Sequence, residues 1–133
     1  MKLRRIAESA WRVVAIEEDD GTCQVLEVLG EGVERGDADA RAMLARISRV
    51  AEQPVLTRNK QQCRPLKGSK NLYELKAGAL RVFWFYYGRM MIVCAEVHEK
   101  TKASELRRQI QRSEELRERL LAAGSPDEIE IVD

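Results

Sequence analysis

The sequence has few residues that can bind a metal or form disulfides, with one histidine and three cysteines in 133 residues. Cys23, Cys63 and Cys94 are odd in number and widely separated, without the short paired spacing of zinc sites and redox motifs. No glycine-rich phosphate loop precedes a helical pattern. We therefore expect reduced, structural cysteines, no metal and no cofactor.

Long hydrophobic runs are also missing. No stretch approaches the ~20 consecutive apolar residues that a membrane-spanning helix needs, and the basic start of the chain is not followed by the apolar core of a signal peptide. No internal repeat or low-complexity tract occurs. With 44% apolar and 34% charged residues, the chain has the composition of a globular protein with a single core. We expect a cytoplasmic protein without membrane contact.

Charge is low in total but unevenly distributed. The formal net charge is +1, yet residues 17–39 contain nine acidic residues against one arginine, whereas residues 58–102 contain ten Lys and Arg against three Glu. Such charge runs often form solvated faces of opposite sign. A basic segment that also carries aromatic residues additionally suits a nucleic-acid phosphate backbone.

The hydrophobic pattern predicts an α+β order of elements. Residues 11–16 are β-branched and aromatic enough for a strand, and apolar residues then recur at helical spacing over 25–33 and 40–51, the second helix capped by Asp37. These two helices form a predicted helical hairpin. Beyond it we expect a polar basic loop over residues 57–62 and three strands of an antiparallel meander over residues 71–76, 80–87 and 90–97. A last helix over residues 105–123 and an acidic tail over residues 125–133 follow. The tail is either a loose end or an added edge strand.

A family resemblance appears in the basic segment. Residues 64–76 read Arg-Pro-Leu-Lys-Gly-Ser-Lys-Asn-Leu-Tyr-Glu-Leu-Lys, and residues 80–85 read Leu-Arg-Val-Phe-Trp-Phe. Residues 97–102, Val-His-Glu-Lys-Thr-Lys, follow where a Lys-Lys-Thr-like turn is usual. In this order the motifs resemble the HigB-like, often phage-derived branch of the RelE/ParE toxin superfamily. The resemblance spans roughly residues 64–121.

The resemblance implies both a fold and a function. The fold would be RelE-like, a twisted antiparallel sheet of about four strands with the helical hairpin on one face and the C-terminal helix near an edge. Residues 1–124 would form the toxin domain, with 1–10 as an N-terminal extension and 125–133 as the tail. The chain would be the toxin of a type II toxin–antitoxin module, a ribosome-dependent endoribonuclease (mRNA interferase) that uses the 2′-hydroxyl of mRNA as nucleophile without a metal. Its partners would be mRNA, the ribosome and a small helix-turn-helix antitoxin.

Four residues are the candidate catalytic groups. Arg81 is the only charge in an otherwise apolar strand, and it either clamps the scissile phosphate or pairs with Glu74 across the hairpin. Lys67 and Lys100 match basic positions of the family and are expected to converge with Arg81 on one concave basic surface. His98 is the only histidine, and it is either a general acid or base or a structural residue.

Four further residues are candidate RNA-binding groups. Arg64 begins the motif of residues 64–76, Lys70 lies with Lys67 in a loop around Gly68, and Lys102 follows Lys100 at the other end of the meander. Tyr73 either stacks on a base or packs in the core.

One departure from the family pattern concerns the rim of the expected site. Glu99 replaces one of two adjacent lysines, and no strong base stands out. The alternative function is therefore a non-catalytic or gyrase-inhibiting binding protein on the same scaffold, and a general nucleic-acid-binding module is a third possibility.

Overall fold

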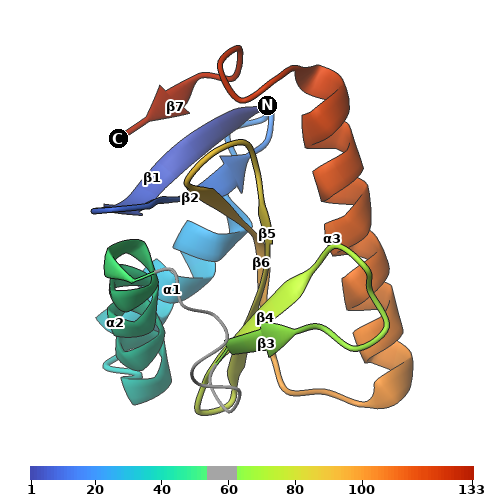
Figure 1. Ribbon diagram of the computed structural model, residues 1–133. Helices are drawn as coiled ribbons and strands as arrows, with labels where there is room; N and C mark the ends of the chain where they lie inside the picture. The colour runs from blue at the N-terminus through green and yellow to red at the C-terminus, as the bar shows by residue number, and fades with distance from the viewer. Residues whose placement is uncertain (54–62) are drawn as a thin grey trace.

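A computed structural model describes residues 1–53 and 63–133 of the chain (Figure 1). The predicted basic loop at residues 57–62 lies outside the described residues. The elements, in chain order, are β1 (Lys2–Glu8), β2 (Arg12–Glu17), α1 (Gln24–Glu34), α2 (Ala38–Glu52), β3 (Cys63–Pro65), β4 (Tyr73–Ala77), β5 (Leu80–Tyr86), β6 (Met91–Glu99), α3 (Ala103–Ala123) and β7 (Ile131–Val132).

The described strands form one mixed sheet of seven, in the order β3-β4-β5-β6-β2-β1-β7. β2 runs parallel to β6, and β7 runs parallel to β1, while the other neighbours are antiparallel. The predicted RelE-like sheet of about four antiparallel strands is therefore wrong. α1 and α2 stand between β2 and β3, which runs opposite to β2, and the three antiparallel pairings from β3 to β6 then bring β6 parallel to β2.

Two strands, β1 and β3, were not predicted from the sequence, because each carries little apolar pattern. The segment interpreted as an extension forms β1, whose only fully buried side chain is Leu3. β3 contains three residues, too few to show an alternation. The tail does form an added edge strand, since Leu3 N donates to Glu130 O at 2.9 Å beside the β1–β7 pairing.

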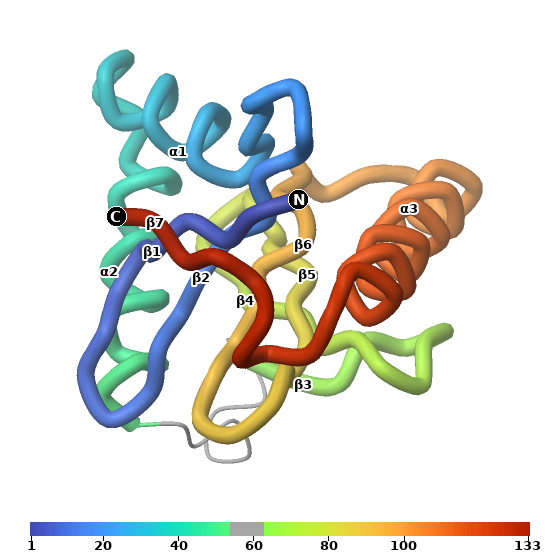
Figure 2. Tube along the Cα trace, turned by 90° about the horizontal axis from the view of Figure 1, so that it is seen from above, coloured from blue at the N-terminus to red at the C-terminus, as the bar shows by residue number. Residues whose placement is uncertain are grey.

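The helices lie on both sides of the sheet. α1 and α2 cover one face as the predicted hairpin, and Asp37 caps α2 as expected by accepting from Asp39 N at 2.9 Å. α3 crosses the opposite face (Figures 1 and 2). Its position near an edge of the sheet was predicted wrongly, because its buried residues pack on the central strands β5 and β6.

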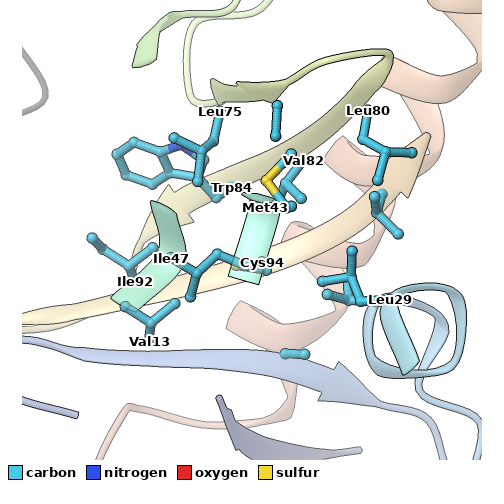
Figure 3. Packing of buried hydrophobic residues seen from close by; sticks show 14 of the residues in the cluster. Val13, Leu29, Met43, Ile47, Leu75, Leu80, Val82, Trp84, Ile92 and Cys94 are labelled. Atoms are coloured by element: carbon cyan, nitrogen blue, oxygen red, sulfur yellow. The ribbon is translucent and has the colours of Figure 1, made fainter. Parts of the chain in front are cut away.

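The core on the α1/α2 face is continuous and apolar. Trp84 and Val82 of β5 point from the sheet toward Met43 and Ile47 of α2, and Leu29 of α1 closes one side (Figure 3). All of these side chains are 2% exposed or less. β5 is a central strand of the sheet, and its residues Val82 to Phe85 are buried on both faces.

The core on the α3 face is smaller and changes character along the sheet. Phe83 and Phe85 pack with Leu72, Ile110 and Leu120. Beyond this apolar half, the same face carries charged side chains of β3, β4, β5 and β6. None of the described helices is long and apolar enough to cross a membrane.

Candidate functional site: a cavity lined by cations

A cavity of about 230 Å³ lies between the charged half of the sheet and the first turns of α3. Four cationic and two acidic residues line it, and one of the two acidic residues, Glu99, lies opposite Leu80, whose side chain belongs to the α1/α2 core. The lining residues are Arg64, Glu74, Lys76, Arg81, Phe83, Glu99, Lys100, Thr101, Leu106 and Gln109. We refer to it as the cation cavity.

The strand register explains why these side chains meet. Arg81 of β5 lies opposite Lys76 of β4 and opposite His98 of β6. Residues directly opposite in a sheet project from the same face, so all three point toward α3. In the next row Glu74 lies opposite Phe83, which extends the same surface.

A β-bulge in β6 keeps the charged side chains of this strand on the α3 face. Trp84 pairs with Cys94, whereas Phe83 pairs with Glu96, so Ala95 is an extra residue in β6. Regular alternation through Ala95 would turn Glu96 toward the apolar core under α1 and α2. The bulge absorbs the extra residue and places Glu96 on the α3 face, where the carboxylate has cationic neighbours.

Glu74 is the buried centre of the charged surface. Its side chain is 7% exposed, and its Oε1 lies 3.4 Å from Arg64 Nε, 3.6 Å from Lys76 Nζ and 4.0 Å from Arg81 Nε. None of these contacts has hydrogen-bond geometry, and Oε1 makes no hydrogen bond among the described residues. The carboxylate thus holds three cations together by charge without occupying their donor groups.

Arg81 is anchored mainly by the β4–β5 turn. Its Nη1 donates to Gly78 O at 3.0 Å and to Leu80 O at 2.9 Å. The side chain is 15% exposed and lines the cation cavity. The two alternatives for Arg81 are therefore not exclusive, since it lies near Glu74 and also faces the cavity.

Lys100 enters the cavity from the segment after β6. Its backbone N donates to Ala79 O at 2.8 Å, which ties this segment to the turn that anchors Arg81. Lys67 does not line the cation cavity. It lines a neighbouring hollow, and Leu106 forms part of both walls. The expected convergence thus holds for Arg81 and Lys100, with Lys67 one step away on the same side of the sheet.

His98 lies beside the cavity but is not part of its lining. Its Nε2 is 3.0 Å from Glu96 Oε1, and its ring centroid is 5.5 Å from that of Phe83. Arg112 of α3 adds a cation 3.5 Å from the same Glu96 oxygen. The histidine, 10% exposed, is thus held under α3 by a carboxylate.

The candidate RNA-binding residues are dispersed. Arg64 lines the cavity, while Lys70 is exposed in the loop between β3 and β4, and Lys102 is exposed at the N-cap of α3. Tyr73 projects from the opposite face, where it stacks on Trp84 with centroids 4.6 Å apart. Tyr73 is therefore separated from the cavity by the sheet, in agreement with the core-packing alternative.

Lys76 and Gln109 line the cavity although neither was predicted from the sequence, and Glu74 was expected only as a partner of Arg81. A signal for Lys76 was available, because residues two apart on a strand share a face and Glu74 and Lys76 follow that spacing. Gln109 lies three residues after Leu106 on the buried side of α3, where only its polar character marks it.

Metal binding and thiol chemistry find little support in the described part of the chain. Residues 1–53 and 63–133 contain no cluster of three or more His, Cys, Asp or Glu placed to hold a metal. Burial raises the pKa of Cys63 and of Cys94 to about 12 in each case, so these thiols are poor nucleophiles at neutral pH.

No family model matches the chain, and no curated protein is significantly similar to it.

Proposed function

We propose that the chain is an endoribonuclease that binds and cleaves RNA in the cation cavity. The observation that carries this proposal is the convergence of Arg64, Lys76, Arg81 and Lys100, which come from four separate segments, on one cavity. A cluster of cations in a partly enclosed site is what a phosphodiester and its more highly charged transition state require. The apolar walls, Phe83 and Leu106, strengthen these interactions by excluding water.

The proposed reaction needs no metal. The 2′-oxygen of a ribose forms a bond to the adjacent phosphorus, the bond from phosphorus to the 5′-oxygen breaks, and the products are a 2′,3′-cyclic phosphate and a 5′-hydroxyl. Arg81 stabilises the transition state, because its Nη1 is engaged with the turn while its Nη2 makes no hydrogen bond among the described residues. Lys100 is the second phosphate ligand.

Proton transfer in this proposal involves one side chain of the cavity and water. The 2′-hydroxyl proton passes to water, because Glu74 is enclosed by cations and Glu99, opposite Leu80 of the α1/α2 core, projects from the other face of the sheet. Lys100 donates a proton to the departing 5′-oxygen. His98 supports the strand beside Arg81 and is a second candidate for the acid.

Glu74 is proposed to act as a positioning residue. Three cations within 4.0 Å of one carboxylate oxygen would repel one another without it. Because Oε1 takes up no hydrogen-bond donor of the cations, their N–H groups remain available to a phosphate. The site is thus preorganised for an anion before RNA binds.

The biological setting follows from the sequence motifs of residues 64–102. These motifs resemble HigB-like toxins, which supports mRNA on the ribosome as substrate, action in the cytoplasm and inhibition by a small helix-turn-helix antitoxin. The alternative is a binding protein without catalysis, or a gyrase inhibitor, which uses the same basic surface.

Induced expression in a bacterial host tests the proposal. We expect growth arrest and new mRNA fragments with 5′-hydroxyl ends, found by mapping RNA 5′ ends, and we expect both to disappear in Arg81→Ala. A matched control is Arg41→Ala, which removes an exposed arginine from α2 on the other face of the sheet. Growth arrest without new RNA ends contradicts the nuclease and favours the binding protein.

A further inference from the structure

A second hollow adjoins the cation cavity and has a different character. It has a volume of about 600 Å³ and lies between α3 and the loop that joins β3 to β4. Its lining residues are Lys67, Gly68, Ala103, Leu106, Arg107, Ile110 and Gln111. We call it the apolar hollow, because Leu106 and Ile110 form its floor.

We propose that the apolar hollow binds the base of the nucleotide next to the phosphate held in the cation cavity. This inference rests on the proposed function. The two sites are continuous, since Leu106 lines both. A strand whose phosphate contacts Arg81 and Lys100 therefore has an apolar surface within reach for the neighbouring base.

Gly68 keeps this surface open. Its φ of +95° lies in the left-handed region that favours glycine, and a Cβ added there would lie 3.7 Å from Ile110 Cδ1. Any side chain at this position would thus contact the floor and cover part of it. The absence of a side chain leaves a flat wall formed by backbone, against which a planar base can lie.

Charge at the rim suits a polyanion. Lys67 on the loop and Arg107 on α3 are both exposed and flank the hollow from opposite walls. A guanidinium such as that of Arg107 can also stack on a base. A wholly apolar partner would gain nothing from these cations, so a nucleotide fits the hollow better than an apolar peptide side chain.

The loop wall is held in place before any ligand arrives. Ser69 Oγ donates to Glu114 of α3 and accepts from Leu72 N at 3.1 Å. Asn71 Nδ2 donates to the other oxygen of Glu114 at 3.4 Å. Because the loop is tied to the helix, the width of the hollow is set by the fold, which lowers the entropic cost of binding.

Binding of matched oligonucleotides separates this inference from the proposed function. Two fluorescein-labelled hexamers with 2′-fluoro sugars, which cannot be cleaved through the 2′-position, carry the same phosphates, but one has bases of mixed sequence and the other is abasic. We expect the wild-type protein to bind the hexamer with bases about tenfold more tightly, as measured by fluorescence anisotropy. Arg81→Ala should weaken both hexamers.

Filling the hollow is the decisive change. Ala103 is exposed at the start of α3 and lines the hollow, so Ala103→Phe should reduce binding of the hexamer with bases to the abasic level and leave abasic binding unchanged. Ala122→Phe, an exposed alanine near the other end of α3, is the control and should retain the tenfold preference.

The outcomes that overturn the inference are distinct. Equal wild-type affinity for the two hexamers, or no effect of Ala103→Phe, contradicts the base site. The proposed function still stands in that case if abasic binding depends on Arg81. In that case the hollow becomes a candidate for a protein partner. If neither hexamer binds, the proposed function and this inference both fall.

Discussion

The two faces of the sheet carry alternate residues of the same strands, but one face is an apolar core and the other is partly polar. On the α1/α2 face Val82, Trp84 and Cys94 belong to an unbroken apolar core. On the α3 face Phe83 and Phe85 are apolar, whereas Arg81 of the same strand belongs to the charged half around Glu74. We infer that the α1/α2 face supplies most of the stability of the fold, which leaves half of the α3 face free for a polar site.

The largest expected effect comes from the α1/α2 face. Trp84→Ala removes a side chain that is 2% exposed and should lower the free energy of unfolding by about 3–5 kcal/mol, measured by urea titration. The three buried cysteines all lie in this core, so their labelling by a thiol reagent should also accelerate. A loss below about 1 kcal/mol would contradict the assignment of stability to this face.

Arg81→Ala tests the opposite face. We expect cleavage to fall by about 10²–10³, in line with the loss of one transition-state donor. Loss of the two hydrogen bonds to the turn should cost about 1–3 kcal/mol of stability, with unchanged thiol labelling. Arg81→Lys keeps the charge but loses the planar fork, and it should recover little cleavage if the phosphate contact is bidentate. Full toxicity of Arg81→Ala would remove this residue from the mechanism.

Glu74→Gln tests whether Glu74 positions the cations in the charged half of the α3 face. The variant leaves Arg64, Lys76 and Arg81 without their common anion, so the cavity gains one unit of positive charge. We expect single-stranded RNA to bind more tightly at low salt while the cleavage rate falls, and we expect a stability loss of about 1–3 kcal/mol. A merely structural glutamate would lower binding and cleavage together.

The smallest effect is expected at the chain end that closes the α3 face. Hydrogen bonding from Ser125 N, at 2.9 Å, lowers the pKa of Glu128 below its ordinary value of 4.5. A depressed carboxyl pKa stabilises the fold above that ordinary value, and the contribution is lost as the pH falls through the folded-state pKa. The difference in melting temperature between wild type and Glu128→Gln should therefore be small at neutral pH and vanish in acid.

Much of the element order was readable from the chain. The strands at residues 80–87 and 90–97 and the helices on each side of them were predicted with small shifts, because long runs of apolar residues at regular spacing leave few alternatives. β1 and β3 were not, because each carries little apolar pattern. Arg81 and Lys100 were predicted for the site from their motif, whereas Gln109 shows its place only once α3 is packed on the sheet.

The sequence by itself determined the three helices, the strands β2, β4, β5 and β6, and which of their faces are apolar, because these properties depend on local spacing. The tertiary structure alone decided the strand order, the parallel pairing of β2 with β6, and the bulge at Ala95 that turns Glu96 toward α3. It also decided that Arg64 reaches the same Glu74 oxygen as Arg81. These contacts join residues distant in the chain, so they follow from how hydrogen bonds and apolar faces are satisfied across the whole sheet.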